Sequence, residues 1–413
     1  MKTRIPHTRK SLLLCLSAML LVGAGCSEPI SLSWEYKGSE PMWSTPLVLE
    51  SGESGLLLVG DEAGYLNALD LETGNQKWRF ATLQDVYSSP AKSQDGKRVL
   101  FGSTNYFFYC LDAEGTLLWK YPTTSRIKSD PAVEGGTVFF TSYDKHVYAV
   151  TVADGKLVWS FPPPEKADTA APEPEAKAKA EAPPDTPTPE PAGEAEAPKG
   201  EGTAAPAEPP KPAVKPGAFS YSSPAIADGM LFVGNLDRHL YALNIKDGRM
   251  AWRFQTGGEV TSTPVVQGGV VYFGSQDKTL YALDTKSGTP KWKFATEGKV
   301  MAKIAFDDGK IYFGSFDHHF YCVNAADGKQ AWKYRTAGPI ISGAAFAQGK
   351  VFFGGGRGDH RFYGLDAKTG QEFWKHENRG GRMDADAVVH EGMLYMACGD
   401  RNLYSFKINV PDR

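Results

Sequence analysis

The sequence lacks the features that mark several large classes of protein. Its 413 residues carry a formal net charge of −3 with no long basic run after the first ten residues, so the electrostatic footprint of a nucleic-acid-binding protein is missing. The longest apolar run, residues 12–22, is shorter than the about 20 residues that a membrane-spanning helix needs. We therefore expect neither a nucleic-acid partner nor a transmembrane helix.

Cysteine is scarce, with five residues in the whole chain and no two of them adjacent. Cys110 in FFYCLD and Cys322 in FYCVN stand where other copies of the same pattern have alanine, which predicts small packed side chains. No spacing typical of a disulfide framework or a metal site emerges, so we expect no metal.

The first 26 residues have the order of an export signal. A basic start is followed by the apolar SLLLCLSAMLLV and then GAGC, which predicts a signal peptide over residues 1–25. VGAGCS resembles the lipobox of bacterial lipoproteins, although Gly23 stands where leucine is usual, and it makes Cys26 the expected lipidated N-terminus. Ordinary cleavage and a buried thiol are the alternatives. Ser27 after the cysteine resembles the pattern that sorts lipoproteins to the outer membrane.

Tryptophan marks an internal repeat. Eight tryptophans stand in W-x-[YF]-like contexts at intervals of 44, 41, 40, 93, 40, 40 and 42 residues. A period near 40 fits the four-stranded blades of a propeller. The eight residues are Trp34, Trp78, Trp119, Trp159, Trp252, Trp292, Trp332 and Trp374.

Each period contains four short runs with the alternation of β-strands and without helical periodicity. In the fifth period they are VTSTPVV, VVYFGS, TLYALD and PKWKFA, separated by QGG, QDK and TKSG. Gly288 in the last of these turns supplies the positive φ that a tight bulged hairpin needs. The fold class expected is all-β.

Copies of the pattern ALDTKSGTPKW, such as ALDLETGNQKW and GLDAKTGQEFW, resemble the tryptophan-docking motif of quinoprotein-like (PQQ-repeat) β-propellers. The resemblance implies that each of the eight tryptophans packs on the motif of the next blade, as a flat ring buried on alanine and glycine. Seven complete motifs are followed by three strands without a fourth, while SLSWEYK at the start is a fourth strand alone. Pairing these two pieces gives eight antiparallel blades and leaves no open edge.

The 93-residue interval between Trp159 and Trp252 contains an insertion of different composition at residues 162–218, with 16 of the 28 prolines of the chain. It lacks the apolar residues needed to offset ordering entropy, so we expect a disordered Pro/Ala/Glu-rich spacer, with docking to a partner or the cell wall as the alternative. The domains expected are residues 26–161 with blades 1–3 and the closing strand, and residues 219–413 with blades 4–8.

No catalytic set emerges from the sequence. The quinoprotein dehydrogenases share the blade motif, but their adjacent cysteine pair and calcium ligands have no counterpart here, so we expect no catalytic residue and no cofactor. His146, His239 and His319 recur at one repeat position, where solvated turn residues are favoured over a metal site. The tripeptide at residues 357–359, Arg-Gly-Asp, matches adhesion ligands but also fits a polar turn.

Blades 6–8 depart from the repeat, because the proline that opens the inner strand of blades 1–5 is replaced by Ile304, Ala344 and Ala387. Charged residues gather there, on inner strands and on loops expected to share one face, as a partner surface or a solvated rim. The candidate partner surface comprises Lys303, Arg357, His360, Arg361, Arg379, Arg382, Asp384 and Asp386.

An exported, lipid-anchored, eight-bladed propeller without a catalytic set resembles the BamB-type lipoproteins of the outer-membrane β-barrel assembly machinery. The resemblance implies a monomeric, non-catalytic scaffold on the periplasmic side of the outer membrane, with a protein partner in that machinery. Exposure at the cell surface is an alternative location. A PQQ-dependent oxidoreductase and a periplasmic or surface ligand-binding propeller are the other functions left open.

Overall fold

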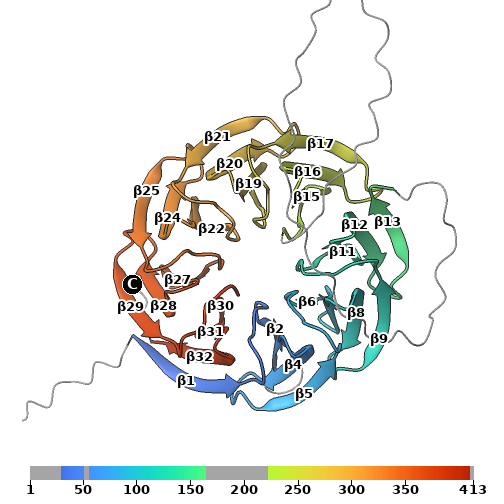
Figure 1. Ribbon diagram of the computed structural model, residues 1–413, viewed down its shortest axis with the longest axis horizontal. Coiled ribbons are helices and arrows are strands. Elements are labelled where there is room, and N and C mark those ends of the chain that lie inside the picture. The colour runs from blue at the N-terminus through green and yellow to red at the C-terminus, as the bar shows by residue number, and fades with distance from the viewer. Residues whose placement is uncertain (1–28, 51–54, 164–221, 410–413) are drawn as a thin grey trace, which may run out of the picture.

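The computed structural model describes residues 29–50, 55–163 and 222–409, and every regular element in these ranges is a β-strand. The strands form eight four-stranded antiparallel sheets arranged as blades in a ring (Figure 1). No helix in the described ranges is long and apolar enough to cross a membrane. The expected all-β fold with eight blades is confirmed.

Each blade runs from an inner strand at the centre of the ring to an outer strand at its edge. The strands of blades 1–4 are β2 (Leu47–Leu49), β3 (Leu56–Gly60), β4 (Tyr65–Asp70) and β5 (Gln76–Ala81); β6 (Ala91–Lys92), β7 (Arg98–Gly102), β8 (Phe107–Asp112) and β9 (Leu117–Pro122); β10 (Ala132–Glu134), β11 (Thr137–Ser142), β12 (His146–Thr151) and β13 (Leu157–Phe161); β14 (Ala225–Ala227), β15 (Met230–Gly234), β16 (His239–Asn244) and β17 (Met250–Gln255). The strands of blades 5–8 are β18 (Val265–Gln267), β19 (Val270–Ser275), β20 (Thr279–Asp284) and β21 (Pro290–Ala295); β22 (Ala305–Asp307), β23 (Lys310–Gly314), β24 (His319–Asn324) and β25 (Gln330–Arg335); β26 (Ala345–Ala347), β27 (Lys350–Gly354), β28 (Arg361–Asp366) and β29 (Glu372–Glu377); β30 (Val388–His390), β31 (Met393–Ala397), β32 (Asn402–Ile408) and β1 (Ile30–Lys37).

The ring closes at blade 8, whose strand order is β1-β32-β31-β30. Strand β1 pairs antiparallel with β32 from Ile30 opposite Ile408 to Lys37 opposite Asn402. The first described strand therefore completes the last blade, as the strand count predicted. The backbone groups on that side of β32 are paired and present no open edge.

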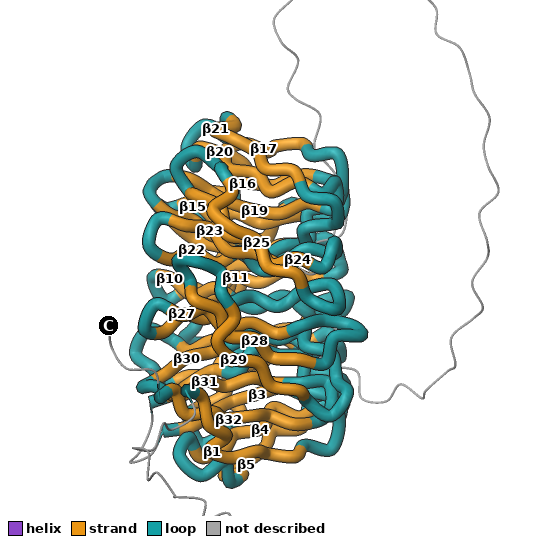
Figure 2. Tube along the Cα trace, turned by 90° about the vertical axis from the view of Figure 1, so that its left-hand side faces the viewer, coloured by secondary structure: helices purple, strands orange, loops and turns teal. Residues whose placement is uncertain are grey.

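The connections lie on two opposite faces of the ring, because neighbouring strands are antiparallel (Figure 2). We call the inter-blade face the one that holds the segments leading from each outer strand to the next inner strand, such as residues 296–304 and 378–387, and the turns between second and third strands. Strand β1 begins at the opposite face and ends at the inter-blade face.

The hydrophobic core lies between the blades as eight separate clusters, each built from two neighbouring blades. Leu231 and Tyr241 of blade 4 pack with Phe139 and Trp159 of blade 3, for example. The seam has its own cluster, in which Met42 and Leu57 meet Tyr395 and Leu403 of blade 8. Burial of these faces joins the blades sideways, so no blade has a complete core by itself.

Seven of the eight tryptophans lie against a glycine of the following blade. A Cβ on Gly288 would lie 2.7 Å from Trp252 Cδ2, and a Cβ on Gly328 would lie 2.6 Å from Trp292 Cε3. Most of these indoles also donate Nε1–H to a carbonyl of that blade. The tryptophan and glycine pairs are Trp34 and Gly74, Trp78 and Gly115, Trp119 and Gly155, Trp159 and Gly248, Trp252 and Gly288, Trp292 and Gly328, and Trp332 and Gly370.

Trp374 is the exception, and the seam explains it. Its next blade is blade 8, whose third and fourth strands come from opposite ends of the chain and share no connecting turn. Trp374 packs instead edge-on against Phe406, with ring centroids 5.2 Å apart. An aromatic ring on β32 thus takes the place that a turn glycine has elsewhere.

Three of the four runs predicted in blade 5 coincide with β19, β20 and β21, but the inner strand is shorter than VTSTPVV implied. Before Pro264 the chain leaves the ladder, because the buried Ser262 Oγ accepts the backbone N–H of Gly274 and donates to its carbonyl, both at 2.8 Å. Serine at this position replaces strand pairing and lets the preceding residues turn into the centre of the ring.

Several predictions concern residues outside the described ranges. The signal peptide over residues 1–25 and the lipidated Cys26 lie there, and so does nearly all of the insertion at residues 162–218. Within the described ranges, Cys110, Cys322 and Cys398 are buried free thiols. Burial raises the pKa of Cys110 and of Cys322 to about 11.

Candidate functional site

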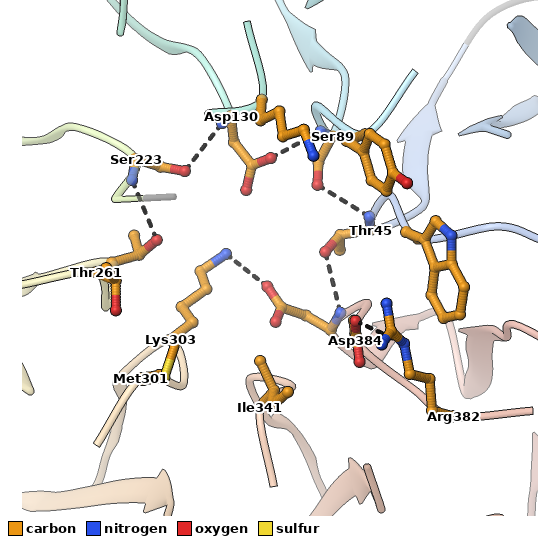
Figure 3. Close-up of a pocket in the computed structure, with 15 residues that line it drawn as sticks. Thr45, Ser89, Asp130, Ser223, Thr261, Met301, Lys303, Ile341, Arg382 and Asp384 are labelled. Atoms are coloured by element: carbon orange, nitrogen blue, oxygen red, sulfur yellow. Dashed lines mark hydrogen bonds and ion pairs between the residues drawn. The ribbon is translucent and has the colours of Figure 1, made fainter. Parts of the chain in front are cut away.

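A cavity of about 390 Å³ lies in the middle of the ring, and its lining side chains point into it from several blades (Figure 3). The segments that lead into the inner strands form its wall. In five of the segments two alternate residues line the cavity, and the residue between them is a buried serine or alanine. Blade 4 contributes Ser223 and blade 7 contributes Ile341, while three residues of blade 8 line the cavity. The lining thus has a mouth tier and, two residues further along each segment, a deeper tier.

The deeper tier is a ring of equivalent positions joined by hydrogen bonds. The side-chain oxygen at this position accepts the backbone N–H of the same position in the preceding blade, as when Ser89 N–H donates to Asp130 Oδ1 at 2.7 Å and Asp130 N–H donates to Ser223 Oγ at 2.9 Å. Six such bonds are present. The ring positions in blades 1–8 are Thr45, Ser89, Asp130, Ser223, Thr263, Lys303, Gly343 and Asp386.

Blades 6 and 7 interrupt this ring, since neither Lys303 nor Gly343 has a side-chain acceptor. A Cβ on Gly343 would lie 2.7 Å from Asp386 Oδ1 and 3.1 Å from Lys303 Cβ. The missing side chain therefore leaves room for Lys303 to reach past blade 7, and its Nζ lies 3.0 Å from Asp386 Oδ2. An ion pair spans the gap in the hydrogen-bonded ring.

The mouth tier combines aromatic, apolar and charged side chains. The Arg382 guanidinium lies over the Trp43 ring at 4.5 Å, and its Nε lies 3.1 Å from Asp384 Oδ2. On the neighbouring blades the Lys128 ammonium lies over the Tyr87 ring at 4.1 Å. Cation–π contacts of this kind hold the two cations at the edge of the cavity.

Burial shifts the ionisation of the deeper groups. It raises the pKa of the Asp130 carboxyl, with the Lys303 charge and the Ser89 N–H opposing that rise. The Asp386 carboxylate raises the pKa of Lys303, and Asp130 adds to this effect while burial opposes it. The Lys303 side chain is 46% exposed through the open cavity, so water screens these interactions and the ion pair adds little to stability.

The structure divides the predicted partner surface into two groups. Four of its members line the cavity: Lys303, Arg382, Asp384 and Asp386. The other four, Arg357, His360, Arg361 and Arg379, lie on the inter-blade face around blades 7 and 8 without lining the cavity. Lys303, Asp384 and Asp386 were expected on inner strands, and this was wrong. They precede β22 and β30, because the ladder pairing of these blades begins only at Ala305 opposite Tyr312 and at Val388 opposite Tyr395.

The outer four residues form a rim in which Arg361 and Arg379 are held by ion pairs. Arg361 Nη2 lies 2.8 Å from Glu377 Oε1, and Arg379 Nη2 lies 3.2 Å from Glu35 Oε2 on the closing strand. Arg357 is exposed in the turn between β27 and β28. The rim therefore joins blade 7 to the seam.

The Arg-Gly-Asp tripeptide does not present an adhesion motif. Asp359 is only 4% exposed, and its carboxylate accepts the hydroxyl of Tyr363 at 2.8 Å and the backbone N–H of Ala337 at 3.1 Å. A buried and bonded carboxylate cannot engage a receptor, so the tripeptide is part of the turn.

The repeated histidines bond within their own blades. His146, His239 and His319 each place Nδ1 about 3 Å from the carbonyl oxygen of the aspartate two residues earlier. Across the described ranges, no group of three or more His, Cys, Asp or Glu side chains is arranged to hold a metal ion.

The sequence predicted four of the fifteen residues that line the cavity and missed the other eleven, above all Asp130, Lys128, Trp43 and Tyr87. Asp130 stands directly before Pro131, at the position that holds serine or threonine before the prolines of four other blades. A carboxylate at a repeat position of small hydroxyl residues was a signal that could have been found. The closeness of Asp130 to Lys303 could not have been predicted, because blades 3 and 6 are distant in sequence.

A closed ring of eight four-stranded blades, joined by tryptophans that dock on turn glycines, defines this protein as a PQQ-repeat β-propeller. The model of one family, described as outer membrane protein assembly factor BamB, matches residues 33–180, 203–304 and 292–409. The chain belongs to that family.

Curated relatives match shorter stretches. Outer membrane protein assembly factor BamB of Nitrosomonas eutropha is 29% identical over 133 residues, which are 32% of this chain and 32% of the relative. The Burkholderia pseudomallei protein of the same name is 29% identical over 98 residues, which are 24% of this chain and 25% of the relative. A β-alanine-activating enzyme of Drosophila melanogaster is 27% identical over 149 residues, which are 32% of this chain and 15% of the enzyme. The chain spans at most about a third of the length of these relatives.

Solved structures agree over the whole ring. BamB from Moraxella catarrhalis superposes with a TM-score of 0.68 at 13% identity, covering 92% of this chain and 99% of that one. Saccharomyces cerevisiae Sqt1 superposes with a TM-score of 0.69 at 11% identity, covering 92% of this chain and 99% of that one. At these identities the likeness shows the fold alone.

Proposed function

We propose that this protein is a non-catalytic scaffold lipoprotein that takes part in the assembly of outer-membrane proteins. Cys26 anchors it on the periplasmic side of the outer membrane, and it acts as a monomeric propeller that binds a protein partner of the assembly machinery. The observation that carries this proposal is the family match, which reaches into all eight blades.

The geometry supports a partner on the inter-blade face. Strand β1 begins at the opposite face, a few residues after Cys26, and a chain of about four residues spans at most about 14 Å. An anchor at Cys26 thus holds the opposite face near the membrane. The rim of Arg357, His360, Arg361 and Arg379 then faces away from the lipid, where a protein partner can reach it.

A catalytic role has weaker support. The enzyme among the relatives is matched over only 15% of its length. The hydroxyls of Thr45, Ser89 and Ser223 accept backbone N–H groups of neighbouring blades, and Asp384 and Asp386 are held in ion pairs, so these groups join the blades to one another. We propose that the protein has no enzymatic activity and needs no cofactor. Quinone titration followed by absorbance tests this directly.

The deciding experiment is affinity purification of the full-length protein from membranes, with identification of the proteins that come with it. We expect subunits of the outer-membrane assembly machinery. Preparations from which these subunits are absent would overturn the proposal.

Charge-reversal variants test whether the partner binds at the rim rather than elsewhere on the surface. Arg357→Glu together with Arg379→Glu should reduce partner recovery several-fold, because both side chains are exposed. The matched control is Arg249→Glu together with Lys329→Glu, which reverses two exposed charges in turns on the opposite face. Equal recovery from both double variants would show that the rim is only a solvated edge.

A further inference from the structure

The charges that line the central cavity balance one another. Asp386 is paired with Lys303 at 3.0 Å and Asp384 with Arg382 at 3.1 Å. A charged ligand would leave this partly enclosed lining with an unbalanced charge, whereas an uncharged ligand would not. The three cations and three carboxylates of the lining, whose formal charges sum to zero, are Lys128, Lys303, Arg382, Asp130, Asp384 and Asp386.

Four hydroxyl groups of the deeper tier have fixed oxygens and protons that the protein does not use. Each oxygen accepts the backbone N–H of the preceding blade. A hydroxyl that accepts one hydrogen bond still has a proton to donate. Within the described ranges no group accepts these protons, so a ligand in the cavity can accept them. The four residues are Thr45, Ser89, Ser223 and Thr263.

The gap in the hydrogen-bonded ring leaves two backbone donors as well. At six ring positions the N–H group donates to a side-chain oxygen of the next blade. By the same pattern, the N–H groups of Thr263 and Lys303 are directed to the side chains of Lys303 and Gly343, which have no acceptor. Neither N–H group has another acceptor in the part of the chain that the structure describes. A ligand oxygen at this gap would supply one.

Asp130 supplies an acceptor on the other side of the cavity. Its Oδ1 accepts the backbone N–H of Ser89 at 2.7 Å, and its carboxylate has no salt bridge with any described residue. Figure 3 shows this carboxylate turned toward the open middle of the ring. An ionised carboxylate has about four acceptor sites, so Asp130 can also accept hydrogen bonds from a ligand. The deeper tier therefore offers several donors and a strong acceptor to the same ligand.

Apolar side chains complete the wall. Met301 and Ile341 lie across the cavity from Asp130 and Ser89 (Figure 3). They suit the C–H groups of a ligand. The volume of about 390 Å³ lies in the lower part of the range of about 300–1,000 Å³ found for small-molecule sites. The cavity therefore fits a small ligand with many polar groups rather than a long chain.

We propose that the central cavity binds an uncharged sugar. A sugar hydroxyl both donates and accepts, so one ligand can donate to Asp130 and accept from the hydroxyls of Ser89 and Ser223. Another of its oxygens accepts from the N–H groups at the gap beside Lys303, and Met301 contacts its C–H groups. The sugar is a free monosaccharide or the terminal unit of a glycan. This binding does not depend on whether the protein takes part in outer-membrane assembly.

The test is calorimetric titration of the purified full-length protein with D-glucose, D-galactose, D-mannose and N-acetyl-D-glucosamine. At least one of them should bind. Analogues of that sugar in which a carboxylate or an ammonium group replaces the primary hydroxyl should bind at least about tenfold more weakly, because each unbalances the charge of the lining. No heat from any of the four sugars up to about 20 mM would overturn the proposal, and so would equal binding of the charged analogues.

A variant at Asp130 tests the acceptor and the charge balance together. Asp130→Asn keeps an oxygen for the Ser89 N–H and should weaken binding of the uncharged sugar at least about tenfold. The lining then has a net positive charge, so the carboxylate analogue should bind more tightly than it does to the unchanged protein. Asp327→Asn, an exposed carboxylate in a turn of blade 6, should leave both affinities unchanged. Unchanged sugar binding by Asp130→Asn would contradict the assignment.

A blocking variant covers the case in which Asp130→Asn does not fold. Ile341→Trp places a larger ring in the cavity and should abolish binding without removing any charge. Full binding by this variant would place the sugar elsewhere and overturn the proposal. The source of the sugar is assigned with a disaccharide that carries it at the non-reducing end. Tighter binding of the disaccharide than of the monosaccharide assigns a glycan terminus, and equal or weaker binding assigns the free sugar.

Discussion

Gly288 shows how one atom decides whether two blades can join. Its φ of 69° lies in the left-handed region, and a Cβ there would lie 2.7 Å from the Trp252 ring. Gly309 has nearly the same φ, 71°, but a Cβ there would meet nothing within 4 Å. A comparison of substitutions at these two residues therefore separates the cost of backbone strain from the cost of displacing the tryptophan.

We expect Gly309→Ala to lower the free energy of unfolding by about 1 kcal/mol, since it adds only left-handed strain. Gly288→Ala should cost about 1–3 kcal/mol more, because the methyl group also displaces Trp252. Urea unfolding of both variants, followed by tryptophan fluorescence, measures the difference. Equal losses would mean that the docked indole moves aside without cost.

The resemblance to the tryptophan-docking motif made the docking predictable at seven positions, because each copy of the motif contains the glycine on which the tryptophan of the preceding copy packs. Trp374 could not be predicted in the same way. Its partner Phe406 belongs to the blade that both ends of the chain build, so no copy of the motif shows what lies there.

Strand β1 is the element on which closure depends. It supplies the outer strand of blade 8 and places Trp34 against Gly74 of blade 1. Without it, β32 has an unpaired edge, and the cluster around Met42 and Tyr395 loses the cover of Trp34 and Tyr36.

A chain that starts at Gly38 should therefore melt at least about 10 °C below a chain that starts at Pro29, and should aggregate on heating. Both lack residues 1–28, so the comparison isolates β1. Circular dichroism with light scattering measures both effects. Identical melting curves would show that seven blades and an open eighth suffice.

Neighbouring blades are also connected by hydrogen bonds to an aspartate, and the sequence shows this connection only in part. In blades 3, 5, 6, 7 and 8 the aspartate in the turn before the third strand accepts the hydroxyl of a tyrosine four residues later and a backbone N–H of the preceding blade. Asp277 does this with Tyr281 at 2.7 Å and with Gly257 at 2.8 Å. The D-x-x-x-Y spacing is visible in the sequence, but the bond to the neighbouring blade is not.

At the scale of the whole molecule, the ring collects charges that no single blade could hold together. Asp130 of blade 3 lies at the same level as Lys303 of blade 6 and Asp386 of blade 8. Burial raises the pKa of Asp130 above its value in the unfolded chain, so the folded protein binds that proton more tightly. Ionisation of Asp130 at neutral pH therefore costs stability, and this cost disappears as the pH falls through the raised pKa.

Asp130→Asn should accordingly melt above the unchanged protein at about pH 7, with the difference shrinking toward about pH 4, where the carboxyl is protonated. Asp327→Asn is the control of opposite sign, because the backbone N–H and the side chain of Lys329 lower the pKa of Asp327. Thermal melts across this pH range measure both. A lower melting temperature for Asp130→Asn at pH 7 would mean that Lys303 needs that charge more than burial opposes it.

The sequence by itself determined the repeat, the blade, the number of blades and the closing strand. Each follows from spacing and alternation within about 40 residues, which local backbone geometry converts directly into strands and turns. Only the tertiary structure decided that Lys303 and Asp386 leave their strands to form an ion pair, that Arg357 and Arg379 stay outside on the rim, and that Asp130 faces the cavity. These contacts join different blades across the centre of the ring, where closure sets the distances and no pattern within a blade records them.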